Sequence, residues 1–124
     1  IKQKLPQNVA LITDCMSAGG RPDGDYMLGE LPVIVENGTA RLKEGGNLAG
    51  SILQLKDGVK HVVDWGLVTV AQALQMASHV PAKSVGLENV CGSLKAGLAA
   101  DFIVLDDSLE LQATFIDGRK AWEK

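Results

Sequence analysis

Apolar residues occur in short runs along this chain, and 14 glycines divide it into short elements. The first apolar run, residues 9–13, predicts a strand buried on both faces, as in a parallel sheet. The run ends at Asp14. A polar, glycine-rich stretch follows, and it predicts a loop over residues 17–25.

A β-hairpin is predicted around Asn37 and Gly38. Residues 33–36 and 39–42 flank this pair, and Asn-Gly supplies the positive φ angles of a type I′ turn. Two glycines at positions 45 and 46 then break the chain before the segment Leu48, Ala49 and Gly50.

Three helices are predicted in the middle of the chain. The first has apolar residues at helical spacing and Gly66 in the position of a C-terminal cap. In the second, Thr69 and Gln72 make a capping box before an apolar stripe. Pro81 opens a third, short helix that Gly86 ends. The stripes comprise Ile52, Leu55, Val59, Val62 and Val63 in the first helix, and Val70, Ala73, Leu74 and Ala77 in the second.

The end of the chain is predicted to be three strands, at residues 102–105, 111–116 and 119–122. The first is entirely apolar and therefore predicts a buried strand, and Asp117-Gly118 predicts a tight turn between the other two. The whole order is strand, hairpin, helices and β meander. A buried strand at residues 9–13 needs parallel neighbours, which this order does not offer. The pattern therefore predicts a piece of a larger fold.

Composition excludes several classes of protein. The 124 residues suffice for one domain with a modest core, and the hydrophobic fraction of 46% is ordinary for a soluble globular protein. A net charge of -3 gives no basic surface for nucleic acid. No apolar run reaches the roughly 18 residues of a membrane span, and no apolar segment of a signal peptide follows residues 1–4. Cys15 and Cys91 are too few for a disulfide framework, so we expect reduced thiols and a cytoplasmic location.

Asp14 is the carboxylate with the strongest claim to chemistry. It follows the predicted buried strand directly, and the active sites of parallel α/β folds gather at the carboxyl ends of strands. A simpler interpretation is that Asp14 only caps a turn. The residues alone predict no metal site, because a zinc site needs three or four ligands and His61 and His79 are isolated in the sequence.

Residues 11–24, LITDCMSAGGRPDG, resemble the last barrel strand and loop of the N-acetylglucosamine-6-phosphate deacetylases of the amidohydrolase superfamily. The resemblance covers essentially all of the chain. The likeness continues through the Asn37-Gly38 hairpin and Leu48-Ala49-Gly50-Ser51. Residues 92–101, GSLKAGLAAD, resemble a segment common across amidohydrolases that returns into a small β-domain.

This resemblance implies an α/β fold, as the C-terminal portion of a (β/α)₈ barrel with part of the small β-domain. Residues 1–90 would supply the last strand, a hairpin insertion and helices of the barrel. Residues 91–124 would supply the C-terminal strands of the small β-domain.

The resemblance also implies a reaction, the metal-dependent removal of acetate from N-acetylglucosamine 6-phosphate to leave glucosamine 6-phosphate. Asp14 corresponds to the family's aspartate that takes a proton from the metal-bound water and later donates one to the leaving amine, the roles of a general base and acid. Leu48, Ala49 and Gly50 correspond to the segment that approaches the substrate, and Gly50 would permit a close approach of the backbone.

The family's metal and phosphate ligands lie upstream of the matching segments, and a whole barrel needs about 250 residues. We therefore expect zinc or iron in the full-length enzyme, but no catalytic metal and no activity in this chain alone. A fragment of this kind leaves strand edges and apolar surface uncovered, so we also expect a homo-oligomer. The expected partner is a sugar phosphate, with no nucleic acid and no membrane.

Two alternatives stay open. The chain could belong to an amidohydrolase with another substrate, although the hairpin and the Leu48-Ala49-Gly50 segment argue against this. It could instead be a non-catalytic interaction module, because a fragment offers open strand edges and an uncovered apolar face.

Overall fold

The computed structural model describes residues 4 and 6–124, which form two compact units. One unit comprises Ile12–Gly58, and the other combines the described residues up to Leu11 with Val59–Lys124. This division differs from the boundary at residue 90 that the resemblance implies. That boundary concerns the arrangement of a whole barrel and stays a prediction.

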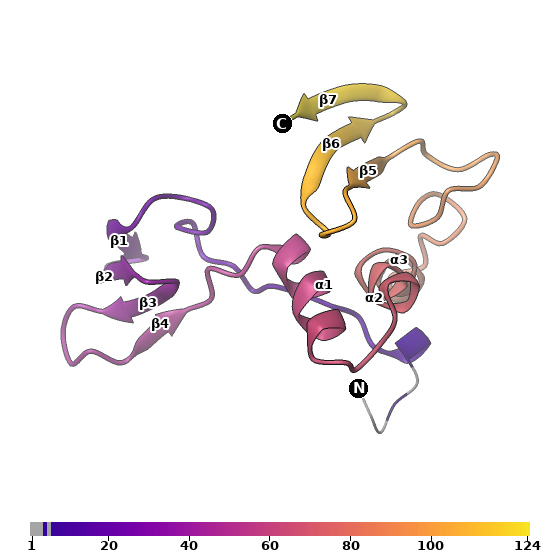
Figure 1. The fold of residues 1–124 in the computed structure, drawn as a ribbon. Coiled ribbons are helices and arrows are strands. Elements are labelled where there is room, and N and C mark those ends of the chain that lie inside the picture. The colour runs from indigo at the N-terminus through magenta and orange to yellow at the C-terminus, as the bar shows by residue number, and fades with distance from the viewer. Residues whose placement is uncertain (1–3, 5) are drawn as a thin grey trace. The chain divides into compact units, whose positions relative to one another are not determined.

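The Ile12–Gly58 unit is built on a four-stranded antiparallel sheet in the order β1-β2-β3-β4 (Figure 1). The predicted hairpin is confirmed as β2, Leu31–Glu36, and β3, Thr39–Leu42. The connecting residues Asn37 and Gly38 have φ angles of 50° and 73°, as a type I′ turn requires.

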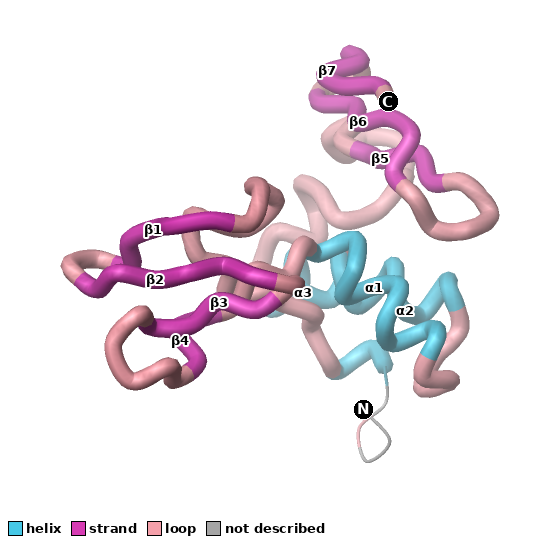
Figure 2. Tube along the Cα trace, turned by 60° about the vertical axis from the view of Figure 1, so that its left-hand side comes forward, coloured by secondary structure: helices cyan, strands magenta, loops and turns pink. Residues whose placement is uncertain are grey.

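The two outer strands were not predicted. β1, Gly24–Leu28, begins inside the stretch expected to be a loop, and β4, Leu48–Gly50, has only three residues. Neither strand has the apolar alternation of a buried strand, and each forms because β2 or β3 presents an unpaired edge to it. Figure 2 shows the four strands side by side.

The core of this unit lies against one face of the hairpin. Val33 and Val35 alternate along β2 and are 0% and 1% exposed, and Ala40 of β3 is 1% exposed. Ala18 joins them from the chain segment before β1, also at 1% exposed. This burial anchors the loop that follows Asp14 to the sheet.

The prediction of a strand over residues 9–13 is wrong for this structure, in which the segment is extended without a ladder. The Leu11 N–H donates to the Met76 carbonyl oxygen at 2.8 Å, and Ile12 is 71% exposed. A β-strand needs a neighbouring strand for its backbone hydrogen bonds. The described residues of this chain do not supply one along this segment.

The second unit contains a short 3₁₀ helix, Pro6–Asn8, and helices α2, Val70–Ala77, and α3, His79–Ser84, while α1 spans Leu55–Asp64. The predicted cap of α1 is confirmed, because Gly66 has a φ of 64° and its N–H donates to the Val63 carbonyl oxygen at 2.8 Å. No helix in the described part of the chain is both long and apolar enough to cross a membrane.

A side-chain cap marks the start of α2, whereas α3 begins without one. The predicted capping box is confirmed, since the Thr69 hydroxyl accepts the Gln72 N–H and the Gln72 side chain accepts the Thr69 N–H. Helix α3 begins at His79, two residues before the predicted opening at Pro81. Proline is tolerated there because the first-turn N–H groups of a helix have no partner within it.

A three-stranded antiparallel sheet ends the chain, with β5, Phe102–Leu105, β6, Leu111–Ile116, and β7, Arg119–Glu123. These strands were predicted almost to the residue. The expected burial of β5 is wrong, because Ile103 and Val104 are 48% and 42% exposed. A single three-stranded sheet cannot cover both of its faces. Phe102 and Leu105 are half-buried, and the Phe102 ring stacks on that of Phe115.

The turn between β5 and β6 is organised by the Asp106 carboxylate. Its oxygens accept the backbone N–H groups of Glu110 and Ser108, each at 2.9 Å, and the Gln112 side chain at 2.8 Å. The bond from Glu110 is the largest cause of a lowered pKa at Asp106. The bonds from Ser108 and Gln112 and the nearby charge of Lys124 also lower this pKa, whereas desolvation of the carboxylate raises it.

This lowered pKa sets the direction of a pH effect on the turn. A carboxylate whose pKa falls on folding stabilises the fold above its unfolded pKa, and the contribution is lost as the pH falls through the folded pKa. We expect an NMR titration of the Asp106 carboxyl to show a midpoint below that of an ordinary aspartate. Asp106→Asn keeps one acceptor oxygen and removes this pH dependence. A midpoint at or above the ordinary value would contradict the assignment.

Candidate functional site

Asp14 lies in an unusual backbone conformation. Its φ of 47° places it in the left-handed region, which few residues other than glycine adopt, although aspartate tolerates it better than most. The residue is exposed and follows the extended segment that ends at Thr13. Backbone outliers of this kind persist only where the surrounding structure holds them, and they gather at functional sites.

A backbone bridge joins the Asp14 segment to the end of β4. Cys15 pairs in parallel with Ser51, and the Met16 N–H donates to the Ser51 carbonyl oxygen at 2.9 Å. Ser51 directly follows Leu48–Gly50, so the bridge brings the two predicted parts of the site together within one unit. The sequence could not predict this pairing, because an isolated parallel bridge has no periodic pattern.

No side chain covers the backbone of Gly50, although neither its φ angle nor its packing requires a glycine at this position. Gly50 is not among the positive-φ glycines, and a Cβ atom added to it would meet only the Met16 side chain, at 3.6–3.9 Å. Those are ordinary contact distances, so an alanine would fit. Leu48, two residues earlier, is 70% exposed. Conformation and packing therefore leave the missing side chain at residue 50 unexplained, and access for a ligand to this backbone would explain it.

The turn over residues 17–20 supports the bridge from the side of Asp14. Gly19 N–H donates to the Met16 carbonyl oxygen at 3.0 Å, and a Cβ atom at residue 19 would lie only 2.0 Å from Cys15 Sγ. Gly19 and Ser51 were not singled out by sequence reasoning. The only available signal was their presence in the segments that resemble the deacetylases.

The described residues do not fit a metal ion. No group of three or more His, Cys, Asp or Glu side chains in residues 4 and 6–124 is placed to hold one. The His61 ring stacks on Trp65 at 5.5 Å, and His79 Nδ1 lies 3.3 Å from Ser93 Oγ. Both histidines therefore have local packing or hydrogen-bonding roles, and no reaction step is assigned to a metal held by this chain.

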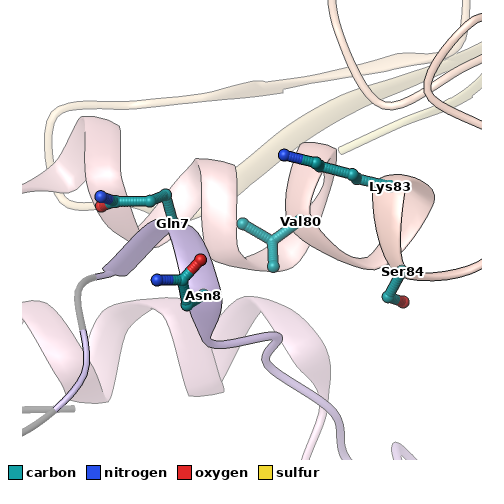
Figure 3. Close-up of a pocket in the computed structure, with 5 residues that line it drawn as sticks. All are labelled: Gln7, Asn8, Val80, Lys83 and Ser84. Atoms are coloured by element: carbon teal, nitrogen blue, oxygen red, sulfur yellow. The ribbon is translucent and has the colours of Figure 1, made fainter.

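A pocket in the other unit is separate from these residues. It has a volume of about 310 Å³ and is lined by Gln7, Asn8, Val80, Lys83 and Ser84. In Figure 3 the two amide side chains come from the short 3₁₀ helix and the other three from α3. The pocket contains neither Asp14 nor any residue of Leu48–Gly50.

Comparison with known proteins shows the family. The model of the amidohydrolase family matches residues 7–121. The N-acetylglucosamine-6-phosphate deacetylase of Vibrio furnissii is 40% identical over 115 residues, covering 93% of this chain and 29% of the relative. A putative N-acetylgalactosamine-6-phosphate deacetylase of Escherichia coli (strain K12) is 42% identical, covering 93% of this chain and 68% of the relative.

Solved structures agree with this assignment. The N-acetylglucosamine-6-phosphate deacetylase of Thermotoga maritima superimposes with a TM-score of 0.84 at 32% identity, over 98% of this chain and 33% of that one. The enzyme of Mycobacterium smegmatis, solved in complex with N-acetyl-D-glucosamine-6-phosphate, gives 0.83 at 33% identity, over 93% and 31%. This chain therefore spans only about a third of the length of these structures. The chain belongs to the amidohydrolase family and, within it, is a relative of the N-acetylglucosamine-6-phosphate deacetylases.

Proposed function

We propose that this chain forms part of a deacetylase that hydrolyses the N-acetyl group of N-acetylglucosamine 6-phosphate. The products are glucosamine 6-phosphate and acetate. The observation that carries the proposal is the left-handed Asp14, whose neighbour Cys15 is bridged to Ser51 directly after Leu48–Gly50. The chain is also 40% identical to a deacetylase over 93% of its length. We place the chain in the proposed enzyme as part of a (β/α)₈ barrel.

Asp14 is the general base and acid in this proposal. Its carboxylate accepts a proton from the attacking water as the oxygen adds to the amide carbonyl. The protonated Asp14 then gives that proton to the nitrogen as the C–N bond breaks, which releases the amine and acetate. The proton returns to the leaving group, so Asp14 ends the cycle as a carboxylate. Its exposed position leaves room for a substrate.

Leu48, Ala49 and Gly50 face the substrate in this proposal. Gly50 leaves its backbone groups open to hydrogen bonds, because no side chain covers them. Amidohydrolases are generally metal-dependent, and zinc or iron would be held by residues that this chain does not contribute. The role proposed for Asp14 is only the transfer of a proton from the water to the leaving nitrogen.

Two further parts of the proposal concern the location and the assembly of the enzyme. The free thiols of Cys15 and Cys91 suit a reducing cytoplasm. Large apolar side chains are exposed, among them Ile12 at 71% and Trp65 at 66%, which supports assembly into a homo-oligomer. Light scattering on the purified protein tests this assembly, and a stable monomer at micromolar concentration would contradict it.

A second candidate substrate is N-acetylgalactosamine 6-phosphate. Two Escherichia coli relatives at 42% identity carry that activity in their names. The two sugars differ only in the configuration of one hydroxyl group, at C4, so the chemistry assigned to Asp14 is the same for both.

Acetate release by the full-length protein that contains this chain tests the proposal. With zinc or iron supplied, we expect a higher kcat/KM for N-acetylglucosamine 6-phosphate than for the galacto isomer. Unphosphorylated N-acetylglucosamine serves as the control and should be a poor substrate, because phosphate recognition is lost. A preference for the galacto isomer favours the second candidate. No acetate release from either sugar phosphate contradicts both, and leaves another amidohydrolase substrate or a non-catalytic role.

A further inference from the structure

The bridge between residues 15 and 51 depends on the groups around it, because it stands outside any ladder of strands. One hydrogen bond, from Met16 N–H to the Ser51 carbonyl oxygen at 2.9 Å, holds the two backbones together. The Ser51 hydroxyl oxygen in turn accepts the Leu53 N–H at 3.1 Å. That second bond fixes the chain just after the bridge, in a loop position where no strand partner does so.

The turn over residues 17–20 holds the other side of the bridge. Ala18 is 1% exposed in the core of the sheet, which anchors the turn. Gly19 N–H donates to the Met16 carbonyl oxygen at 3.0 Å, and a Cβ atom added at residue 19 would clash with Cys15 Sγ, at 2.0 Å. The missing side chain at Gly19 therefore permits the observed position of Cys15.

These contacts hold residues 15 and 16, which follow Asp14 directly in the chain. The φ of 47° at Asp14 costs free energy and needs support from the surrounding structure. Residue 15 is the next residue along the chain, so a movement of Cys15 rotates the peptide unit that it shares with Asp14. The conformation of Asp14 thus depends on the bridge from Cys15 to Ser51 and on the contact between Cys15 and Gly19.

We propose that Gly19 and Ser51 are positioning residues for the Asp14 carboxylate. They act through the backbone of residue 15 and set the distance from the carboxylate to Leu48–Gly50. This inference rests on the proposed function and deepens it, by naming what places the general base. A general base must come within about 2.6–3.2 Å of the atom whose proton it takes. A misplacement of about 1 Å can cost roughly 10²-fold in rate.

Gly19→Ala in the full-length enzyme tests the role of Gly19. The added methyl group displaces Cys15 Sγ, so we expect kcat to fall by about 10-fold or more while KM changes little. Cys15→Ala makes room for that methyl group. The double variant Gly19→Ala with Cys15→Ala should therefore return to the kcat of Cys15→Ala alone.

Three further variants keep the test specific. Ser51→Ala removes the acceptor of the Leu53 N–H and should lower kcat, whereas Ser51→Thr keeps the hydroxyl and should restore it. Gly58→Ala is the matched control, because its methyl group would meet only Leu53 Cδ2 at an ordinary 3.6 Å. We expect wild-type kcat and KM for Gly58→Ala.

The outcomes separate this inference from the proposed function. A wild-type protein that releases no acetate refutes the proposed function. An active wild type with an unchanged kcat in Gly19→Ala, or a loss that Cys15→Ala does not restore, overturns the positioning role. The melting temperatures of the wild type, the two single variants and the double variant measure the coupling between residues 15 and 19 without relying on activity. If the effects of the two substitutions on melting temperature simply add, residues 15 and 19 are not coupled, and the inference fails.

Discussion

We expect Asp14→Asn to lower turnover by about 10²-fold or more in the proposed full-length enzyme, the scale of general acid–base catalysis. Asparagine has nearly the shape of aspartate and also tolerates a φ of 47°, so the backbone at this position should be preserved. A carboxamide, however, cannot accept the proton of the attacking water. Steady-state kinetics with N-acetylglucosamine 6-phosphate measure the loss, and metal analysis should show content close to that of wild type.

Asp25→Asn is the matched control for this substitution. Asp25 lies in the same unit, and its carboxylate forms an ion pair with Lys43 in which both side chains are well exposed. Such surface pairs contribute little to stability, so activity should be unchanged. Near-normal deacetylation by Asp14→Asn would remove Asp14 from the mechanism. An equal loss in Asp25→Asn would indicate a general effect of lost charge.

Gly92→Ala is expected to destabilise the fold by about 2–4 kcal/mol, from a strained backbone and a steric clash together. Gly92 has a φ of 86°, which an alanine adopts only at a cost. Its Cβ atom would also lie 2.7 Å from the Ala82 Cβ atom and 3.1 Å from the Ser78 carbonyl oxygen. Helix α3 would have to move away from the loop that follows it. Urea or thermal unfolding measures the change in the free energy of unfolding.

Gly97→Ala separates the two causes. Gly97 has a similar φ of 90°, but no atom would lie within 4 Å of its added Cβ atom. We expect only the cost of the backbone conformation there, about 1–2 kcal/mol. Equal destabilisation by the two substitutions would show that the steric clash at Gly92 adds nothing to the change in the free energy of unfolding.

Turns and caps were predictable from the sequence because a few adjacent residues determine them. Asn37-Gly38 and Asp117-Gly118 take positive φ angles at both positions, and the strands on either side follow. The capping box of Thr69 and Gln72 is likewise complete within one helical turn. In each case adjacent residues set the local conformation, and distant groups only add to it. The Asn37 N–H donates to an Asp23 carboxylate oxygen, and the Asp117 N–H donates to an Asp101 carboxylate oxygen.

Whether residues 9–13 form a strand depends on distant parts of the chain. Their apolar composition indicates a strand buried on both faces, but a strand forms only beside a partner that offers hydrogen bonds. In this segment the Leu11 N–H donates to the Met76 carbonyl of α2 and the Val9 N–H to the Pro6 carbonyl. Neither partner is a strand, and the segment stays irregular. The prediction that β5 is buried was wrong for a related reason. Apolar residues become buried only where another layer covers them.

The candidate site shows the same division. The sequence by itself determined that Asp14 follows an apolar run and opens a glycine-rich loop, and that Leu48–Gly50 follows a hairpin. Only the tertiary structure brought these segments together, through the bridge from Cys15 to Ser51, and placed Asp14 in the left-handed region. The physical reason is that a backbone bridge between distant segments uses N–H and C=O groups, which every residue except proline carries alike, so no residue type in the sequence marks where it will form.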